Sequence, residues 1–265
     1  MNTSIRVASY NIHKGFSHFN KRMVIHDLRS RLRALDSDIV FLQEVQGSHS
    51  GHAQRWQYWP NAPQHEFLAD EMWSNYVYGK NAVYDLGHHG NAVLSRYPII
   101  EWENLDISDH AFESRGLLHV VIEVPNMASH LHVFCLHLAL FERSRKRQLE
   151  LVCRRVREHV PEQAPLIIAG DFNDWRGHSG RKFAATLGLK EVYETMHGQV
   201  ARSFPASLPI LSLDRIYVRG WQVRQAEVIG RMGGWHGSDH AALVAMLESP
   251  AERSPAPSGT GLRLD

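Results

Sequence analysis

The sequence predicts a single α/β domain that is rich in strands and carries a few amphipathic helices. Short apolar runs bounded by Pro or Gly, such as 166–169 between Pro165 and Gly170, are typical of buried strands. Two longer segments, 23–35 and 142–160, place apolar residues at helical spacing instead. A chain of 265 residues can bury a substantial core, and no repeat or internal linker divides it. We therefore expect residues 1–248 to form one domain.

The expected elements can be placed along the chain by these patterns. Strands are predicted at 5–10, 39–42, 75–84, 90–95, 99–105, 117–124, 131–136, 166–169, 215–218, 223–229 and 241–247. Helices are predicted at 23–35, 64–73, 142–160 and 181–187. Residues 47–63 are polar and aromatic, and we expect them to form a long functional loop. Residues 249–265 are rich in Pro, Ser and Gly and are expected to be a disordered tail.

Composition and charge disfavour some classes of protein. The formal net charge is +1, from 29 Lys and Arg against 28 Asp and Glu, so no global positive field favours a long polyanion as partner. Cys135 and Cys153 lie in apolar stretches and are expected to be buried without a disulfide, which favours a reducing compartment. The N-terminus lacks an apolar leader segment, and no stretch reaches the length of a membrane span, so we predict a cytoplasmic protein.

Histidines, arginines and aromatic residues each leave two interpretations open. The 18 His residues favour metal or acid–base chemistry, but His49, His52, His88 and His89 are expected in solvated polar loops. The basic side chains of 142–160 are expected to form a solvated outer face, with a binding patch as the alternative. The aromatic residues of 56–59 and 73–78 either pack on the core, stack on bases or lie on a lipid interface.

Polar side chains adjoin many of the predicted strands. Asn11, Glu44, His137, Asp171 and Asn173 follow strands, whereas Asp214, Asp239 and His240 precede them. Among antiparallel neighbours, the ends of some strands share a sheet edge with the beginnings of others. We therefore expect these eight side chains to converge on one rim. In the stretch LIIAGDFNDW, the last two residues, Asp174 and Trp175, are expected only to form a turn and to pack.

The residue types in this set permit a specific chemistry. Carboxylate and amide oxygens suit Mg²⁺ or Mn²⁺, and a zinc site would normally use Cys or several His. These oxygens belong to Asn11, Glu44, Asp171, Asn173 and Asp239. Such a cation polarises a phosphoryl oxygen and neutralises charge on the leaving group. His240 paired with Asp214 can deprotonate water, and His137 can donate to phosphoryl oxygens.

The motifs SYNIHKG, FLQEV, GNAVLSRYP, HLAL, IIAGDFND, LDRIYV and GSDHAALV occur in this order along the chain. In the order of these motifs, the chain resembles the endonuclease/exonuclease/phosphatase superfamily. That superfamily includes DNase I-like and exonuclease III-like nucleases, neutral sphingomyelinases and inositol-polyphosphate 5-phosphatases. The resemblance runs from about Ile5 to Leu247 and looks closest to small bacterial members. It implies a four-layer αββα sandwich of two mostly antiparallel sheets with outer helices, as in DNase I.

The resemblance also implies catalytic roles. His240 matches the base that activates water, and Asp214 matches the carboxylate that orients it. Asp171 and Asn173 match the pair that positions water or the leaving group and contacts the phosphate. His137 matches the phosphate-contacting His of the DNase I-like branch, where exonuclease III-like enzymes have Tyr.

Metal and substrate contacts follow from the same resemblance. Glu44 matches the principal metal ligand, Asn11 the nearby Asn that orders metal and phosphate, and Asp239 the Asp of the SDH motif, often a ligand. Arg115 and Asn91 are further candidates for phosphate contacts, although a salt bridge is the alternative for Arg115. The Gly-rich loop before SDH makes Trp235 and His236 candidates for contacting the group beyond the scissile phosphate.

Three hypotheses for function follow. The first is a Mg²⁺-dependent phosphodiesterase, with Mn²⁺ as a substitute, acting on nucleic acid or a phospholipid headgroup; the near-zero charge weakens the case for a processive duplex-DNA enzyme. The second is a phosphomonoesterase acting on a small phosphorylated molecule such as an inositol phosphate. The third is a nucleic-acid- or lipid-binding module that has lost catalysis. In each case we expect a monomer without a stable protein partner.

Overall fold

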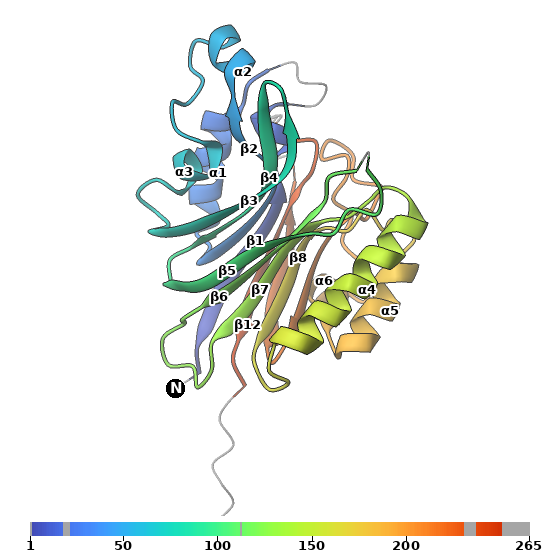
Figure 1. The fold of residues 1–265 in the computed structure, drawn as a ribbon. Helices are drawn as coiled ribbons and strands as arrows, with labels where there is room; N and C mark the ends of the chain where they lie inside the picture. The colour runs from blue at the N-terminus through green and yellow to red at the C-terminus, as the bar shows by residue number, and fades with distance from the viewer. Residues whose placement is uncertain (1, 18–21, 112, 231–236, 251–265) are drawn as a thin grey trace, which may run out of the picture.

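The structure, a computed structural model, describes residues 2–17, 22–111, 113–230 and 237–250 and contains two six-stranded sheets packed face to face (Figure 1). The first sheet has the order β11-β12-β1-β2-β4-β3 and comprises β1 (Ser4–Asn11), β2 (Ile39–His49), β3 (Asn75–Tyr84), β4 (Gly87–Ser95), β11 (Gln222–Ile229) and β12 (Ala242–Glu248). The second has the order β5-β6-β7-β8-β10-β9 and comprises β5 (Ile99–Asp106), β6 (Gly116–Ile122), β7 (Leu131–His137), β8 (Leu166–Asp171), β9 (Lys190–Glu191) and β10 (Asp214–Arg219). Most neighbouring strands are antiparallel, but β1 with β2 and β7 with β8 run parallel.

Helices cover the outer faces of both sheets (Figure 1). The first sheet is covered by α1 (Ile25–Leu35) and α3 (Gln64–Ala69), and the second by α4 (Glu142–His159) and α5 (His178–Leu187). The shorter helical segments are η1 (His13–Gly15), α2 (Ser50–Arg55) and α6 (Val192–His197). The predicted four-layer αββα sandwich is therefore confirmed.

The central strands, such as β6 and β8, are buried on both faces, which explains their near-continuous apolar runs in the sequence. Along β1, Ile5 and Val7 face the layer between the sheets, whereas Ala8 and Tyr10 face the layer under α1. This alternation follows from the two-residue period of a strand. Cys135 and Cys153 are buried free thiols, as predicted.

The strand that carries Glu44 differs from its prediction. The polar pair Gln43–Glu44 was expected to end the strand, but β2 continues to His49, and α2 fills part of the expected 47–63 loop. The register against β4 shifts between Leu42 and Val45, and Glu44 has a φ of 54°. Glu44 thus lies in a β-bulge, a device that redirects a side chain without ending the strand.

Other expectations about exposure were also wrong. His88 and His89 are half-buried in β4 and do not lie in a solvated loop, because the hairpin with β3 extends that strand. Arg145 is buried, although the basic side chains of this helix were expected to be solvated. Trp73, by contrast, packs on the core, which was one of the interpretations left open for it, and its indole donates to the Ser37 carbonyl at 2.8 Å. The short β9 and α6 were not anticipated.

Residues 251–265 of the expected tail lie outside the described residues. Among the helices of the described residues, none combines the length and apolarity needed to cross a bilayer.

Candidate active site

Strand pairing brings three of the predicted site residues into one row. His137 ends β7, Asp171 ends β8 and Asp214 begins β10, and Asp171 is the register partner of both. Parallel pairing aligns the ends of β7 and β8, and antiparallel pairing places the beginning of β10 beside them. The first sheet contributes Asn11 at the end of β1, so that both sheets meet at this edge.

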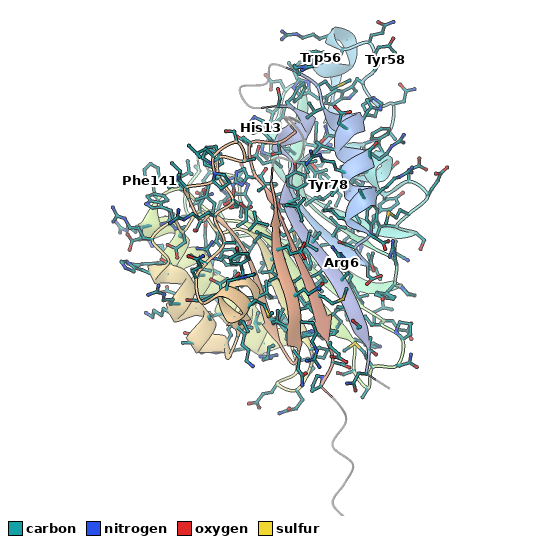
Figure 2. All side chains as sticks on the ribbon, turned by 180° about the vertical axis from the view of Figure 1, so that it is seen from behind. Arg6, His13, Trp56, Tyr58, Tyr78 and Phe141 are labelled. Atoms are coloured by element: carbon teal, nitrogen blue, oxygen red, sulfur yellow. The ribbon has the colours of Figure 1, made fainter. Side chains whose placement is uncertain are left out.

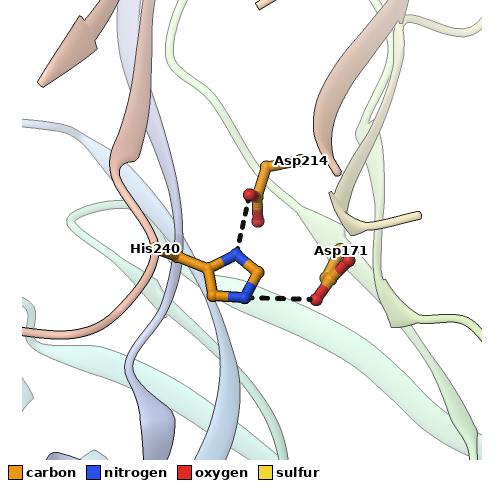
Figure 3. Close-up of side chains that lie close together, drawn as sticks. All are labelled: Asp171, Asp214 and His240. Atoms are coloured by element: carbon orange, nitrogen blue, oxygen red, sulfur yellow. Dashed lines mark hydrogen bonds and ion pairs between the residues drawn. The ribbon is translucent and has the colours of Figure 1, made fainter. Parts of the chain in front are cut away.

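The imidazole of His240 makes a short hydrogen bond with the carboxylate of Asp214. The Nδ1 atom of His240 lies 2.8 Å from Oδ2 of Asp214, and the ring packs 5.0 Å from that of Phe204 (Figure 3). Both residues are buried. Burial would lower the pKa of His240, but the charge and hydrogen bond of Asp214, with the charges of Asp171 and Asp239, raise it to about 10. The contact leaves Nε2 directed toward Asp171, 3.8 Å away.

Asp214 is itself fixed by the segment that precedes it. Ser203 donates its hydroxyl hydrogen to Oδ2 of Asp214, and the Asp214 backbone N–H lies 3.2 Å from that hydroxyl oxygen. The other carboxylate oxygen, Oδ1, is buried without a hydrogen-bond partner among the described residues. A buried carboxylate oxygen without a donor is costly.

Asp171 lies at the centre of the contacts. Its Oδ2 accepts from Nδ2 of Asn11 at 3.2 Å and lies 3.5 Å from Nε2 of His137. Its Oδ1 accepts from the backbone N–H of Asn173 at 3.0 Å, and Nδ2 of Asn173 donates to the Leu138 carbonyl. Burial raises the pKa of Asp171 to about 6, against the opposing effect of the charge on His240.

His13, which the sequence analysis did not single out, contacts both Glu44 and Asp239. Nδ1 of His13 lies 3.4 Å from Oδ1 of Asp239 and 3.9 Å from Oε2 of Glu44. Lys14 Nζ is 3.8 Å from the same Glu44 oxygen, and Nδ2 of Asn11 is 3.4 Å from Oε1. The predicted metal ligands are therefore neighbours.

The only sequence signal for His13 and Lys14 is that they follow Asn11 after one residue, Ile12. In the structure both have positive φ angles, 44° and 56°. A left-handed backbone at two non-glycine residues is uncommon and is often found at functional sites. The backbone N–H of His13 donates to Oδ1 of Asn11 at 3.1 Å, which turns the chain into the site.

Arg115 lies near His137, and Asn91 contacts the residue that follows Arg115. Burial and the charge of Arg115 hold the pKa of His137 well below its usual range. Arg115 Nε is also 3.9 Å from Glu113, so the salt bridge considered as its alternative is present. Asn91 is buried and donates its amide to the carbonyls of Gly116 and Cys135, at 3.0 and 3.4 Å. It thereby ties β4 to the residue after Arg115.

The remaining predicted positions separate into two groups. Trp235 and His236 lie outside the described residues. Asp174 is more than a turn residue: its Oδ2 accepts from the Gly180 N–H at 2.8 Å, and its carbonyl accepts from Arg215. Trp175 is exposed and lies against Arg145.

A cation fits this site chemically. Asp171, Asp214 and His240 each offer a ligand atom, and these atoms lie within 4.8 Å of one another. Glu44 and Asp239 add two carboxylates, and hard oxygen donors of this kind suit Mg²⁺ or Mn²⁺.

Sequence comparison decides the family. The model of the Endonuclease/Exonuclease/phosphatase family matches residues 8–240. The chain belongs to this family. It is 45% identical over 244 residues to the Uncharacterized protein YbhP of Escherichia coli (strain K12), covering 92% of this chain and 96% of that protein. The family description itself names enzymes that hydrolyse phosphoesters.

Solved structures of lower sequence identity share the fold. A family member from Beutenbergia cavernae DSM 12333 has a TM-score of 0.73 at 20% identity, covering 93% of this chain and 72% of that one. The mannosyl-6-phosphatase Bt3783 of Bacteroides thetaiotaomicron VPI-5482 has a TM-score of 0.69 at 18% identity, covering 92% and 99%. D. rerio TDP2 complexed with single strand DNA product has a TM-score of 0.67 at 19% identity, covering 92% and 99%.

Proposed function

We propose that the protein is a divalent-cation-dependent phosphodiesterase that uses Mg²⁺, with Mn²⁺ as a substitute, and a water molecule activated by His240. The observation that carries this proposal is the buried pair of His240 and Asp214, 2.8 Å apart, with Nε2 directed toward a group of carboxylates. An imidazole fixed through Nδ1 has one free nitrogen with which to take a proton from water.

Each neighbouring residue has a part in this mechanism. Glu44, Asp239 and Asn11 hold the cation, which supplies Lewis-acid polarisation of the phosphoryl oxygen when bound. Asp214 fixes the tautomer and orientation of His240. Against the effect of burial, the charges of Asp214, Asp171 and Asp239 raise the pKa of His240. A bound cation that shares their charge would lower it again and would let Nε2 accept a proton.

The phosphate would lie beside His137 and the end of β8. His137 is neutral at pH 7 because of its lowered pKa, and it can donate one ring N–H to a phosphoryl oxygen. Asn173 and Asp171 position the water or the leaving group, since the turn that joins them is fixed by their own hydrogen bond. Arg115 stabilises negative charge on the same side.

Charge balance favours a diester over a monoester. The cations Lys14 and Arg115 already lie near carboxylates, at 3.8 and 3.9 Å, so little unbalanced positive charge is left for a dianion. A phosphodiester carries one negative charge at neutral pH, whereas a monoester carries up to two. A phosphomonoesterase remains the second candidate, and it would require Lys14 or Arg115 to leave its carboxylate.

Hydrolysis of bis-p-nitrophenyl phosphate tests the proposal. We expect activity with Mg²⁺ or Mn²⁺ that EDTA and His240→Ala both abolish, and weaker activity on p-nitrophenyl phosphate. Activity on the monoester alone would establish the second candidate. Tight binding of nucleic acid or lipid without turnover of any phosphoester, under any divalent cation, would instead identify a binding module.

A further inference from the structure

Exposed apolar side chains surround the candidate active site on the side of the second sheet. Leu140 and Phe141 are 61% and 72% exposed and lie between His137 and α4. Trp175 is 45% exposed and follows Asn173 by two residues. Figure 2 shows Phe141 directed outward at the edge of the molecule. Large apolar side chains that cluster on a surface commonly mark a binding site.

A third loop beside the candidate active site also carries exposed apolar side chains. Leu208 and Ile210 are exposed on the segment between Ser203 and Asp214. The backbone of this segment is joined to the site, because the Ala206 N–H donates to the Asp239 carbonyl at 2.7 Å. We call Leu140, Phe141, Trp175, Leu208 and Ile210 the apolar rim. All five belong to loops whose neighbouring residues are site residues.

The exposure of Leu140 and Phe141 is built into the fold. Arg145 is only 2% exposed, and its Nη1 donates to the carbonyls of Leu140 and Ala139. Its guanidinium carbon lies 5.3 Å from the centre of the Trp175 ring, so it joins two loops of the rim. The Ala139 N–H donates to Gln148 at 2.9 Å. A buried arginine thus fixes a backbone whose side chains point away from the core.

Positive charge lies beside the apolar rim. The segment 140–147, LFERSRKR, carries three cations besides the buried Arg145: Lys146 is paired with Glu142 and Arg147 with Asp109, each at 2.7 Å, whereas Arg143, like Arg176, is exposed. Between α4 and α5, a groove of about 600 Å³ is lined by Lys146, Arg154, Arg157 and Lys182, with Glu150 as its one carboxylate. Its apolar lining comes from Leu149, Cys153 and Phe183.

We propose that the apolar rim and the adjoining cations dock on an anionic phospholipid bilayer. Aromatic rings are favoured at the membrane interface, aliphatic side chains are favoured just below it, and Lys and Arg are attracted to anionic headgroups. A single-stranded nucleic acid fits less well, because Leu140, Leu208 and Ile210 offer no ring on which a base could stack. The bilayer would lie at the mouth of the candidate active site.

Sedimentation with lipid vesicles tests this surface on the full chain. Vesicles of phosphatidylcholine, alone or mixed with phosphatidylglycerol, are used with EDTA, so that binding is measured without hydrolysis. We expect binding to the mixed vesicles that weakens as salt is added. The double change Leu140→Ser with Phe141→Ser should lower the partition coefficient about ten-fold or more, because it removes two side chains from the apolar interior. Arg143→Glu with Arg176→Glu should weaken binding to the mixed vesicles only.

Trp102→Ser is the matched control, because Trp102 is 54% exposed on the edge strand β5 and outside the rim. It should leave binding unchanged. Thermal unfolding of all variants should match the parent, since every altered side chain is exposed. The proposal is overturned if the parent does not bind mixed vesicles, if Trp102→Ser weakens binding equally, or if the rim variant loses affinity only for a labelled single-stranded oligonucleotide. Because catalysis is not measured, failure here is distinct from failure of the proposed hydrolysis.

Discussion

In the proposed mechanism, Asp214 serves catalysis through another side chain, His240. It touches His240 and Ser203 in the buried row at the end of the sheet. We expect Asp214→Asn to lower kcat about 10²–10⁴-fold, the range in which general-base catalysis contributes, because the amide holds His240 in a less basic state. Calorimetric titration with Mn²⁺ should show that the cation still binds. Unchanged turnover would contradict the role assigned to Asp214.

Glu44 is expected to act mainly on the cation. Glu44→Gln keeps the size of the side chain in the bulge but removes the charge that faces His13 and Lys14. The concentration of Mg²⁺ for half-maximal activity should rise by at least the roughly 10–100-fold that even an outer ligand partner contributes. At saturating Mg²⁺, much of the turnover should return. If that concentration stays the same, Glu44 is not a ligand.

At the residue scale, sequence reasoning found which side chains converge but missed their neighbours. Asn11, His137, Asp171 and Asp214 stand at strand ends, where polar residues after apolar runs are visible in one dimension. His13 has no such pattern, because its place beside Asp239 depends on a turn at the end of β1 and on a chain segment more than 200 residues away. A pairing of that kind is set by tertiary packing.

At the scale of elements, apolar periodicity predicted the long strands and helices because each buries a regular face. It failed at the β2 bulge, because polar residues such as Gln43 and Glu44 after an apolar run are the pattern expected where a strand ends. It also failed for β9 and α6, which are too short to show a period. For α4, composition suggested a solvated basic face, and nothing in the pattern distinguished Arg145 from its exposed neighbours.

Arg145 provides a test at this scale. Arg145→Met should lower the free energy of unfolding by about 1–3 kcal/mol, because it leaves the carbonyls of Ala139 and Leu140 without their donor. Urea denaturation followed by circular dichroism measures the change. Arg154→Met, at an exposed position of the same helix, should change the free energy by no more than about 0.5 kcal/mol. Equal effects of the two changes would show that Arg145 has no special structural part.

At the scale of the whole molecule, the candidate active site lies at one edge of the sandwich, and a second titratable group lies on the outer face of the second sheet. There, His119 in β6 lies 3.0 Å from His132 in β7 and 3.2 Å from Glu103, which Arg155 of α4 also contacts. His119 stacks on Phe134 with the ring centres 4.1 Å apart. Burial, with the charge of His119, lowers the pKa of His132 to about 4.

The lowered pKa of His132 predicts how the stability of the fold depends on pH. In an unfolded chain, His132 binds a proton near its ordinary pKa, about 6.5. In the folded chain its pKa is about 4, so it binds that proton only at a lower pH. Between these values the unfolded state binds more protons, so stability falls as the pH falls, by at most about 1.4 kcal/mol per pH unit for this group. Above pH 6.5 both states are neutral there and the contribution is flat.

His132→Gln should therefore flatten the pH profile, whatever it does to stability at pH 7. Urea denaturation at a series of pH values between 7 and 4.5 gives the free energy of unfolding for the parent and the variant. The loss on acidification should be smaller in His132→Gln than in the parent, because one proton fewer is taken up on unfolding. His178→Gln, at an exposed position at the beginning of α5, should keep the parent profile. Parallel profiles for the parent and His132→Gln would mean that the His119–His132 contact does not couple protonation to folding.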